Sequence, residues 1–431
     1  QELKDIMSNW PAPEIADLML DIDKYGRVLL FRSLPRDKSA EVFAYLEHEQ
    51  RDALLRELTD QETRELLADL PPDDRTSLLE ELPAKATKRV MNLLSAGDLR
   101  EARELLGYPE ESIGRHMTPD YVVVKPHWKI SRALEQIRIF GKDSETINRV
   151  YVVDNDGKLL DDILLRYIIL ANPDDEISSL MDYNVVSLSA FDDQEEAVRT
   201  MEKYDIGALP VVDSEGKLVG IVTFDDVMDI SEEEATEDFQ KISAINPVET
   251  TYLNASKWKL WRRRFPWLLV LMLANFITAA VISVYSETIE AVVALTFFIP
   301  LLIGTAGNAG TQSATLIIRS LAIKEIELTD WLKVFLKEFS IGFFLGLVLG
   351  IFTYIRGVFE GQGGSIELAL VISLTMVVLV VWANLIGALL PLLLNKLNLD
   401  PAVISSPFIA TLIDVTGIFI YFNIAIWILG L

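Results

Sequence analysis

The C-terminal part of the chain contains five long apolar stretches, and these limit the possible folds more than any other feature. They lie at about residues 265–285, 291–318, 333–356, 366–394 and 404–430 of the 431-residue sequence. Each is close to or above the roughly 20 residues that a helix needs to cross the hydrocarbon core of a bilayer. In lipid, only helices and closed barrels satisfy their backbone polar groups internally. The sequence therefore predicts a domain of five transmembrane α-helices.

The last apolar stretch contains an acidic residue, Asp414. An ionised carboxylate at this depth costs about 3 kcal/mol or more, so we expect Asp414 to face a helix bundle or a water-filled cavity. Oxygen-bearing side chains lie nearby, at Ser405, Ser406, Thr411 and Thr416. An oxygen-rich surrounding without sulfur is typical of a site for a hard cation. The alternative is a structural role, in which Asp414 hydrogen-bonds between helices.

Charge is distributed very unevenly along the chain. Residues 1–256 contain 54 acidic and 28 basic residues, a net charge of −26, whereas residues 257–431 contain 10 and 11. A strongly acidic surface argues against nucleic acid as a partner and favours divalent cations. The chain has no cysteine, and its three histidines are scattered. Thiolate metal sites and disulfides are therefore excluded.

Residues 1–110 read as short amphipathic helices separated by prolines, as at Leu34-Pro35, Leu70-Pro71-Pro72 and Leu82-Pro83. Apolar residues recur three to four positions apart, with charged residues between them. This pattern predicts a helical repeat with acidic outer faces. Most individual acids in such a repeat would simply be solvated.

Residues 112–230 contain a repeated motif. Tyr151-Val152-Val153-Asp154-Asn155-Asp156-Gly157 recurs as Pro210-Val211-Val212-Asp213-Ser214-Glu215-Gly216, and each copy predicts a strand, a glycine turn and a second strand. With their flanking helical segments, the copies form a β-α-β-β-α unit used twice. This region resembles a pair of CBS domains, which implies ATP or another adenine nucleotide as a candidate ligand.

The resemblance to CBS domains also points to candidate nucleotide-binding residues. They are Thr223 and Asp226 in the second copy and Arg166 in the first. The first copy departs from the pattern, because it has Leu164-Leu165-Arg166-Tyr167 where the second has Thr223-Phe224-Asp225-Asp226, and Asp161 occupies the position of Gly220.

Eight acidic residues follow within the 14 positions from 225 to 238. Asp226, Asp229 and Glu233 share one helix face by their spacing, so they repel one another unless cations lie between them. The alternative is an ordinary solvated acidic helix. We expect residues 232–262 to form one connecting helix, broken or bent near Pro247, that leads into the membrane.

Basic residues indicate the orientation in the membrane. Arg262–Arg264 precede the first span, and the loops after the second and fourth spans carry Arg319, Lys324, Lys333, Lys337 and Lys396. The other two loops have one base, Arg356, against four acids. The positive-inside rule then predicts a cytoplasmic N-terminus and an outer C-terminus in a cell inner (plasma) membrane.

Three motifs in the spans are specific. They are Gly307-Asn308-Ala309-Gly310-Thr311-Gln312-Ser313, Asn384-Leu385-Ile386-Gly387, and the stretch from Asp400-Pro401-Ala402 to Asp414-Val415-Thr416-Gly417. Together with the acidic helical N-domain and the CBS pair, they resemble the MgtE family of magnesium transporters and channels over essentially the whole chain. The expected fold is a multi-domain membrane protein with an α-helical repeat N-domain, an α/β CBS-domain pair, a long connecting helix and a five-helix α transmembrane domain.

The resemblance implies a homodimer with a pore along its two-fold axis, lined by the second and fifth spans. Asp414 and the backbone carbonyl of Ala410 would hold Mg²⁺ there, and Asn308, Gln312, Ser406 and Thr411 would line the pore. The protein would be a channel for passive Mg²⁺ influx, not an enzyme. Ser406 departs from the asparagine common in relatives.

The resemblance further implies that Mg²⁺ on the cytoplasmic side closes the pore. The matching regulatory positions are Glu41, Asp73, Asp193, Glu195, Asp205, Asp226, Asp229, Glu234, Glu237, Asp238 and Asp400. We expect an N-domain at residues 1–111, tandem CBS domains at 112–231, a connecting (plug) helix at 232–264 and a pore domain at 265–431. Ser77 replaces an acid found in some relatives.

Two other functions remain open from the sequence. One is a broader divalent carrier for Co²⁺ or Mn²⁺, or an ion-coupled carrier. The other is a membrane-tethered nucleotide sensor whose CBS pair signals to a partner. No Gly-x-x-x-x-Gly-Lys loop occurs in the sequence, which argues against an ATP-driven pump.

Overall fold

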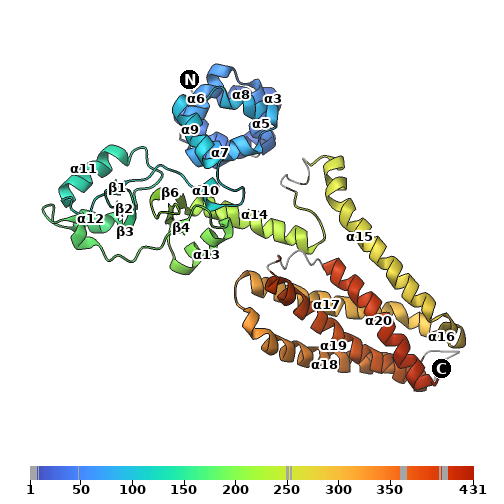
Figure 1. The fold of residues 1–431 in the computed structure, drawn as a ribbon. Helices are drawn as coiled ribbons and strands as arrows, with labels where there is room; N and C mark the ends of the chain where they lie inside the picture. Colours follow the sequence, from blue (N-terminus) through green and yellow to red (C-terminus); the bar gives the residue numbers. More distant parts are fainter. Residues whose placement is uncertain are drawn as a thin grey trace. The chain divides into compact units, whose positions relative to one another are not determined.

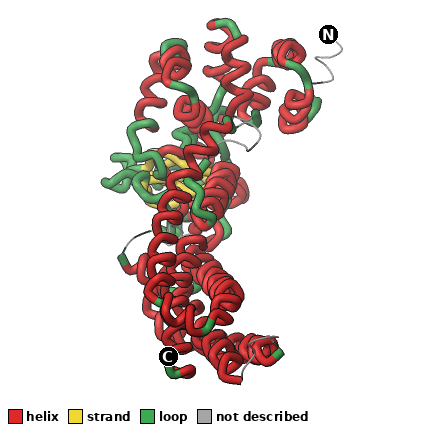
Figure 2. The backbone as a smooth tube through the Cα atoms, turned by 90° about the vertical axis from the view of Figure 1, so that its right-hand side faces the viewer, coloured by secondary structure: helices red, strands yellow, loops and turns green. Residues whose placement is uncertain are grey.

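The structure, a computed structural model, describes residues 7, 9–46, 48–248, 252, 255–359, 366–397, 399 and 406–431. It separates into two compact units, residues 1–234 and 235–431, and many of their elements are labelled in Figure 1. Within the described residues, strands occur only between positions 123 and 223, and the remaining regular structure is helical (Figure 2).

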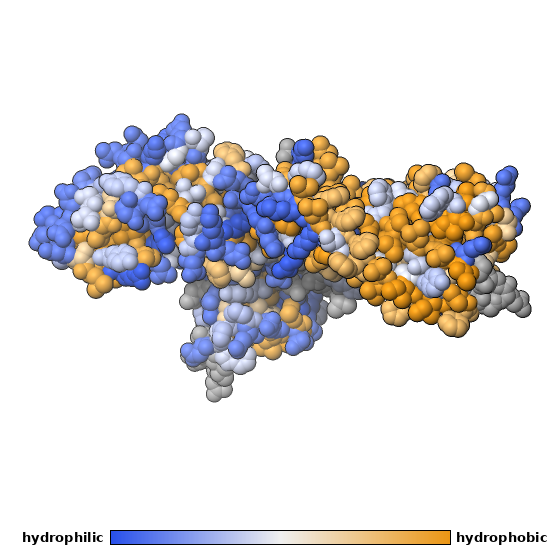
Figure 3. Space-filling view, turned by 90° about the horizontal axis from the view of Figure 1, so that it is seen from below, coloured by the Kyte–Doolittle hydropathy of each residue, from blue (hydrophilic) through white to orange (hydrophobic). Residues whose placement is uncertain are grey.

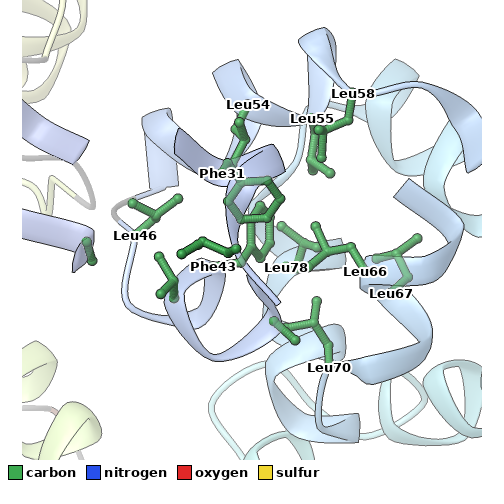
Figure 4. Packing of buried hydrophobic residues seen from close by; sticks show 14 of the residues in the cluster. Phe31, Phe43, Leu46, Leu54, Leu55, Leu58, Leu66, Leu67, Leu70 and Leu78 are labelled. Atoms are coloured by element: carbon green, nitrogen blue, oxygen red, sulfur yellow. The ribbon is translucent and has the colours of Figure 1, made fainter. Parts of the chain in front are cut away.

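The N-terminal part of the first unit consists of short helices that follow one another along the chain. Pro35, Pro71 and Pro83 occupy the N-cap positions of three of these helices, where a missing N–H costs no hydrogen bond. Alternate helices pack on each other, and Phe31 meets Phe43 edge to face at 6.4 Å between ring centroids inside a leucine-rich core (Figure 4). The helices are α2 (Ala12–Asp21), α3 (Lys24–Ser33), α4 (Arg36–Ala44), α5 (His48–Glu57), α6 (Asp60–Asp69), α7 (Pro72–Glu81), α8 (Ala84–Met91) and α9 (Ala96–Leu105). The expected helical repeat is confirmed.

The rest of the first unit contains two copies of one small α/β unit. Each has a three-stranded sheet in which the first two strands are parallel and the last two antiparallel, with the register shift at the same place in both copies. Gly157 and Gly216 form the two hairpin turns at φ of +86° and +79°, which only glycine adopts readily. The first copy comprises β1 (Val123–Val124), α11 (Ile130–Phe140), β2 (Arg149–Val153), β3 (Leu159–Leu164) and α12 (Leu165–Leu170); α10 (Ile113–His116) precedes it in the sequence but packs against the second copy. After η1 (Ile177–Leu180), the second comprises β4 (Leu188–Ser189), α13 (Gln194–Tyr204), β5 (Ala208–Val212), β6 (Leu218–Thr223) and α14 (Phe224–Ile242).

The structure explains why the two copies differ at Asp161 and Gly220. A Cβ atom at Gly220 would lie 2.7 Å from the sulfur of Met117. Asp161 is buried instead, and its carboxylate accepts hydrogen bonds from the backbone N–H groups of Asp182 and Tyr183 at 2.8 and 3.0 Å. Asp161 therefore stabilises the segment that joins the two copies.

The expected connecting helix is α14, but its bounds differ from the prediction. It starts inside the second copy at Phe224 and ends at Ile242, and the next helix begins only at Lys257. Ala244 adopts a left-handed φ of +60°, and the N–H of Ile245 reaches back to the carbonyl of Gln240 at 2.9 Å. This hydrogen-bonded C-cap ends the helix before Pro247 is reached. The described residues beyond the cap, 243–248, 252 and 255–256, are not helical, so the break is wider than a bend at Pro247.

Among its described residues, the second unit contains five helices long and apolar enough to cross a membrane, as expected. They are α15 (Lys257–Val284), α17 (Ile299–Ala322), α18 (Trp331–Val358), α19 (Ile366–Lys396) and α20 (Ser406–Leu429), with the short elements α16 (Ser286–Ala291), η2 (Val293–Phe298) and η3 (Leu328–Asp330) between them. Apolar residues dominate the face of these helices that is visible in Figure 3.

Glycines let the membrane helices approach closely. On α18, Gly342, Gly346 and Gly350 are buried against α19, and a Cβ atom at Gly346 would lie 2.9 Å from the Cα of Val377. Small residues at four-residue spacing are typical of membrane helix interfaces. By contrast, α15 packs against α20, but none of the α15 residues is buried in the single chain.

Candidate functional site

The helices α17 and α20 meet beside the acidic residue of the last span. A Cβ atom at Gly307 on α17 would lie 3.8 Å from the Cβ of Ala410 on α20. Asp414 follows Ala410 by one helical turn and is half-buried. Asn308, next to Gly307, and Gln312, one turn later, are exposed on α17 in the single chain. The structure thus places a carboxylate and two amides on neighbouring membrane helices.

The two hydroxyl residues predicted for the same site are placed differently. Thr411 is buried, and its hydroxyl donates a 2.9 Å hydrogen bond to the carbonyl of Pro407 on its own helix. Ser406 is the first residue of α20 and is half-buried. The Thr411 hydroxyl is therefore engaged within α20.

A second group of acids lies in the first unit, where α7 and the start of α14 contribute carboxyl groups. Oδ1 of Asp73 is buried and lacks a hydrogen-bond partner. Burial raises the pKa of Asp73 well above its usual value, and the charges of Asp226, Asp74 and Glu145 raise it further. Burial also raises the pKa of Asp226 to about 7, although hydrogen bonds from Thr223 oppose the shift.

Neighbouring acids extend this group. Burial raises the pKa of Asp74, and the charges of Asp225 and Asp229 add to the shift while Arg51 opposes it. Burial likewise raises the pKa of Asp229 and of Glu145, and Asp225 adds to both shifts. We call the following residues the carboxylate cluster: Asp73, Asp74, Glu145, Asp225, Asp226 and Asp229.

The carboxylate cluster is not a ready-made metal site. Among the described residues, no three carboxylate, histidine or cysteine side chains converge as direct ligands for one ion. The acids instead lie close enough to oppose each other's ionisation. Such an arrangement favours any counter-charge that enters it, whether protons or cations.

Several predicted regulatory acids lie apart from the cluster in this single chain. Glu41 is exposed and pairs with Lys38 at 2.8 Å. Asp193 caps the start of α13 by accepting the N–H of Glu195 at 2.9 Å, whereas Asp205 caps its end in a left-handed conformation. The rise of a helix separates the two ends by roughly 18 Å. Asp193 and Glu195 are thus neighbours, but Asp205 is not close to them.

The remaining regulatory positions lie on α14 or beyond the described residues. Glu234 accepts a hydrogen bond from the amide of Gln194. Glu237 pairs with Lys241 one turn later at 2.7 Å, and Asp238 is also on this helix. Asp400 lies outside the described residues.

The candidate nucleotide residues lie at the starts of two different helices, α14 and α12. The hydroxyl of Thr223 donates to Asp226 at 2.6 Å and lies equally near Asp225, so this pair is preorganised at the start of α14. In the first copy, Arg166 stacks over the ring of Tyr167, 4.9 Å from its centroid. The sequence of the first copy has no pair like Thr223 and Asp226 at this helix start.

Comparison with known proteins covers all these regions. Residues 299–424 match a family model described as a divalent cation transporter, residues 10–111 match the MgtE intracellular N domain, and residues 111–172 and 177–248 match CBS domains. A magnesium transporter MgtE of Thermus thermophilus is 42% identical over 337 residues, which cover 78% of this chain and 74% of that protein. The chain belongs to the MgtE family of magnesium transporters. It is therefore a multi-pass membrane protein of a family whose transported ion is Mg²⁺.

Other MgtE proteins support the same assignment. That of Bacillus subtilis is 34% identical over 335 residues, which cover 78% of this chain and 73% of the relative. The solved cytosolic domain of the Mg²⁺ channel MgtE in complex with ATP matches with a TM-score of 0.51 and 34% identity, over 53% of this chain and 93% of that one.

One polar residue of the MgtE membrane domain was missed in the sequence. Glu338 lies on α18, inside the third predicted span, and is 6% exposed. The signal was present, because an acid within a predicted span suggests a specific role by the same argument that applies to Asp414.

Proposed function

We propose that the protein is a Mg²⁺-selective channel for passive influx rather than an enzyme. The observation that carries this proposal is the carboxylate of Asp414 within a membrane helix, one turn from Ala410, which itself lies against Gly307 of α17. Mg²⁺ loses its water reluctantly, so a carboxylate and nearby amides would hold the hydrated ion. A potential of 100 mV, negative inside, supplies about 4.6 kcal/mol for a divalent ion.

A homodimer completes such a pore. Asn308 and Gln312 are exposed on a membrane-spanning helix of the single chain, and amides facing lipid are unfavourable. A second copy related by a two-fold axis would place the same polar face opposite and enclose an ion pathway. The membrane is the cell inner membrane, with the N-terminus in the cytoplasm and the C-terminus outside.

The acidic first unit is the proposed sensor of cytosolic Mg²⁺. Burial and neighbouring carboxylates raise the pKa values of Asp73 and Asp226, so these acids come together at lowest cost when a cation lies among them. Mg²⁺ with several retained waters suits a cluster without converging direct ligands. At low Mg²⁺ the charges repel and the parts separate. This equilibrium is a population shift driven by ion binding.

The helix α14 is the proposed route from sensor to pore. It carries Asp226 and Asp229 in the first unit and continues without interruption to Glu237 and Ile242 in the second. Functionally, residues 1–111 and 112–231 then form the sensor, residues 232–264 the connection and residues 265–431 the pore. Mg²⁺ bound at the cluster and along α14 would hold the pore shut.

Adenine nucleotide is a second proposed ligand. The MgtE cytosolic domain that was solved with ATP is similar over the first half of this chain, and Thr223 and Asp226 are preorganised at the start of α14. Nucleotide at this position would share Asp226 with the carboxylate cluster. Nucleotide and Mg²⁺ would therefore influence each other's binding.

Flux into liposomes tests the channel proposal. Purified protein is reconstituted with a Mg²⁺-sensitive dye inside, and a potential is imposed with potassium and valinomycin. Passive flux should follow the electrochemical gradient of Mg²⁺ and continue when proton and sodium gradients are abolished. A strict requirement for either gradient would instead indicate an ion-coupled carrier.

A further inference from the structure

Glu338 is a buried acid in the membrane domain that neither the proposed pore nor the proposed sensor uses. Its Oε2 accepts a hydrogen bond from the hydroxyl of Ser313 on α17 at 2.9 Å and one from the side-chain amide of Asn384 on α19 at 3.2 Å. All three side chains are at most 6% exposed. The carboxylate thus joins three membrane helices through neutral donors.

Close backbone contacts bring these three helices to the same point. A Cβ atom at Gly387 on α19 would lie 2.2 Å from the carbonyl oxygen of Gly310 on α17. A Cβ atom at Gly342 on α18 would lie 3.0 Å from the Cα of Val381 on α19. Each glycine is three or four residues from Ser313, Glu338 or Asn384, so it lies about one turn away. The polar contact therefore lies where the backbones of the three helices pack closely against one another.

Ser313 connects this contact to the proposed pore face. It follows Gln312 directly, and consecutive helical residues point about 100° apart. Gln312 is accordingly exposed while Ser313 is buried. The Ser313 hydroxyl also lies 3.1 Å from the backbone carbonyl of Asn384. Its hydrogen bonds fix how far α17 is turned about its own axis, and hence where Asn308 and Gln312 point.

We propose that Glu338 is a positioning residue that acts through Ser313 to set the rotation of α17 and so the selectivity of the ion pathway. This inference rests on the proposed pore function. Removing the carboxylate leaves the Asn384 amide without this acceptor and leaves Ser313 with only the backbone carbonyl of Asn384. The helix then gains freedom to turn, and its two exposed amides lose their fixed placement.

The test compares ion selectivity in full-length protein in liposomes. Glu338→Gln keeps an acceptor oxygen and the size of the side chain, whereas Glu338→Leu and Ser313→Ala each remove one side of the contact. We expect Glu338→Gln to retain the wild-type ratio of Mg²⁺ to Mn²⁺ flux. Glu338→Leu and Ser313→Ala should shift this ratio by about threefold or more, the size expected for one interhelical hydrogen bond.

The controls separate positioning from folding. Thr353 is also buried on α18, but its hydroxyl bonds only to Gly350 of its own helix at 3.0 Å, so Thr353→Val should leave the ratio unchanged. A lower maximal flux at an unchanged ratio in Glu338→Leu and Ser313→Ala would overturn the proposal, because misfolding reduces the number of channels and not their selectivity. If Glu338→Leu does not fold, Ser313→Ala alone decides.

The same experiment distinguishes this proposal from the pore assignment. Asp414→Asn is measured alongside the other variants. Flux that survives in Asp414→Asn contradicts the pore whatever the Glu338 variants do. Flux that is lost in Asp414→Asn, with a wild-type ratio in both Glu338→Leu and Ser313→Ala, contradicts only the positioning role.

Discussion

The carboxyl group of Asp226 is the charged neighbour that contributes most to the raised pKa of Asp73, after burial itself. The two residues come from different parts of the first unit, α14 and α7. Bringing two acids together in this way costs free energy unless protons or cations compensate. The relationship makes the structure of the first unit depend on its ionic surroundings.

Asp226→Asn should make the first unit less dependent on Mg²⁺. The substitution removes one negative charge from the carboxylate cluster, so in EDTA the N-domain should be digested by protease about tenfold more slowly than in the wild type, equivalent to about 1.4 kcal/mol. Added Mg²⁺ should slow the digestion of the N-domain less in Asp226→Asn than in the wild type. Glu202→Gln, an exposed acid on α13, is the matched control and should behave like the wild type. Equal Mg²⁺ protection in Asp226→Asn and wild type would argue against the cluster as a Mg²⁺ site.

Proton release should accompany Mg²⁺ binding below about pH 7. Because the pKa of Asp226 is raised to about 7, this carboxyl still holds a proton at pH 6 that Mg²⁺ must displace. Calorimetry in buffers of different ionisation enthalpy should therefore detect proton release at pH 6 and much less at pH 8. An equal number of released protons at both pH values would contradict the raised pKa.

In the absence of Mg²⁺, the raised pKa of Asp226 determines the direction in which stability changes with pH. Between the unfolded value of about 4 and the folded value, the native state binds a proton that the unfolded state has lost. The contribution of Asp226 to stability therefore falls as the pH rises from about 4 to 7. In EDTA, protease resistance of the N-domain should decrease over this window in the wild type and decrease less in Asp226→Asn.

Gly387→Ala should destabilise the membrane domain. The added methyl group would meet the carbonyl oxygen of Gly310 at 2.2 Å, and overpacking of this kind costs about 1–3 kcal/mol. The midpoint of thermal unfolding in detergent should fall by several degrees. Gly304→Ala is the control, since its Cβ atom would meet nothing within 4 Å. A wild-type midpoint for Gly387→Ala would show that α17 and α19 are not in backbone contact.

Thr223→Val should weaken ATP binding while preserving the fold. The valine has nearly the same shape but loses the hydroxyl that bonds Asp226, so we expect the dissociation constant to rise by about tenfold. Isothermal titration of the full-length protein measures it. Arg166→Ala is the comparison, because Arg166 stacks on Tyr167 and the first copy lacks the Thr-Asp pair. A larger loss in Arg166→Ala would move the nucleotide site to the first copy.

Long apolar spans and repeated turns made most of the fold predictable from the sequence. The five membrane helices follow from length and hydropathy alone, and Gly157 and Gly216 identify the two copies of the α/β unit because each occupies a left-handed turn. The end of α14 was not predictable, because it depends on a left-handed conformation at Ala244, a residue that carries no preference for it.

The candidate site could be predicted only in part. Asp414 stands out because it interrupts an apolar run, and the acidic spacing on α14 drew attention to Asp226. Two other members of the carboxylate cluster, Asp74 and Glu145, were harder to find, since they come from distant segments and are ordinary surface acids by their local sequence. Glu338 escaped notice because its partners Ser313 and Asn384 lie on two other helices. Side-chain contacts between distant segments are not encoded in any local pattern.

The most direct test of the whole account is Mg²⁺ flux into liposomes for the wild type and Asp414→Ala, measured at low and at millimolar Mg²⁺ on the cytoplasmic face. We predict that wild-type flux is high at low cytoplasmic Mg²⁺ and shut at millimolar Mg²⁺, and that Asp414→Ala conducts in neither condition. Flux that is unaffected by Asp414→Ala would contradict the pore. Wild-type flux that ignores cytoplasmic Mg²⁺ would contradict the sensor.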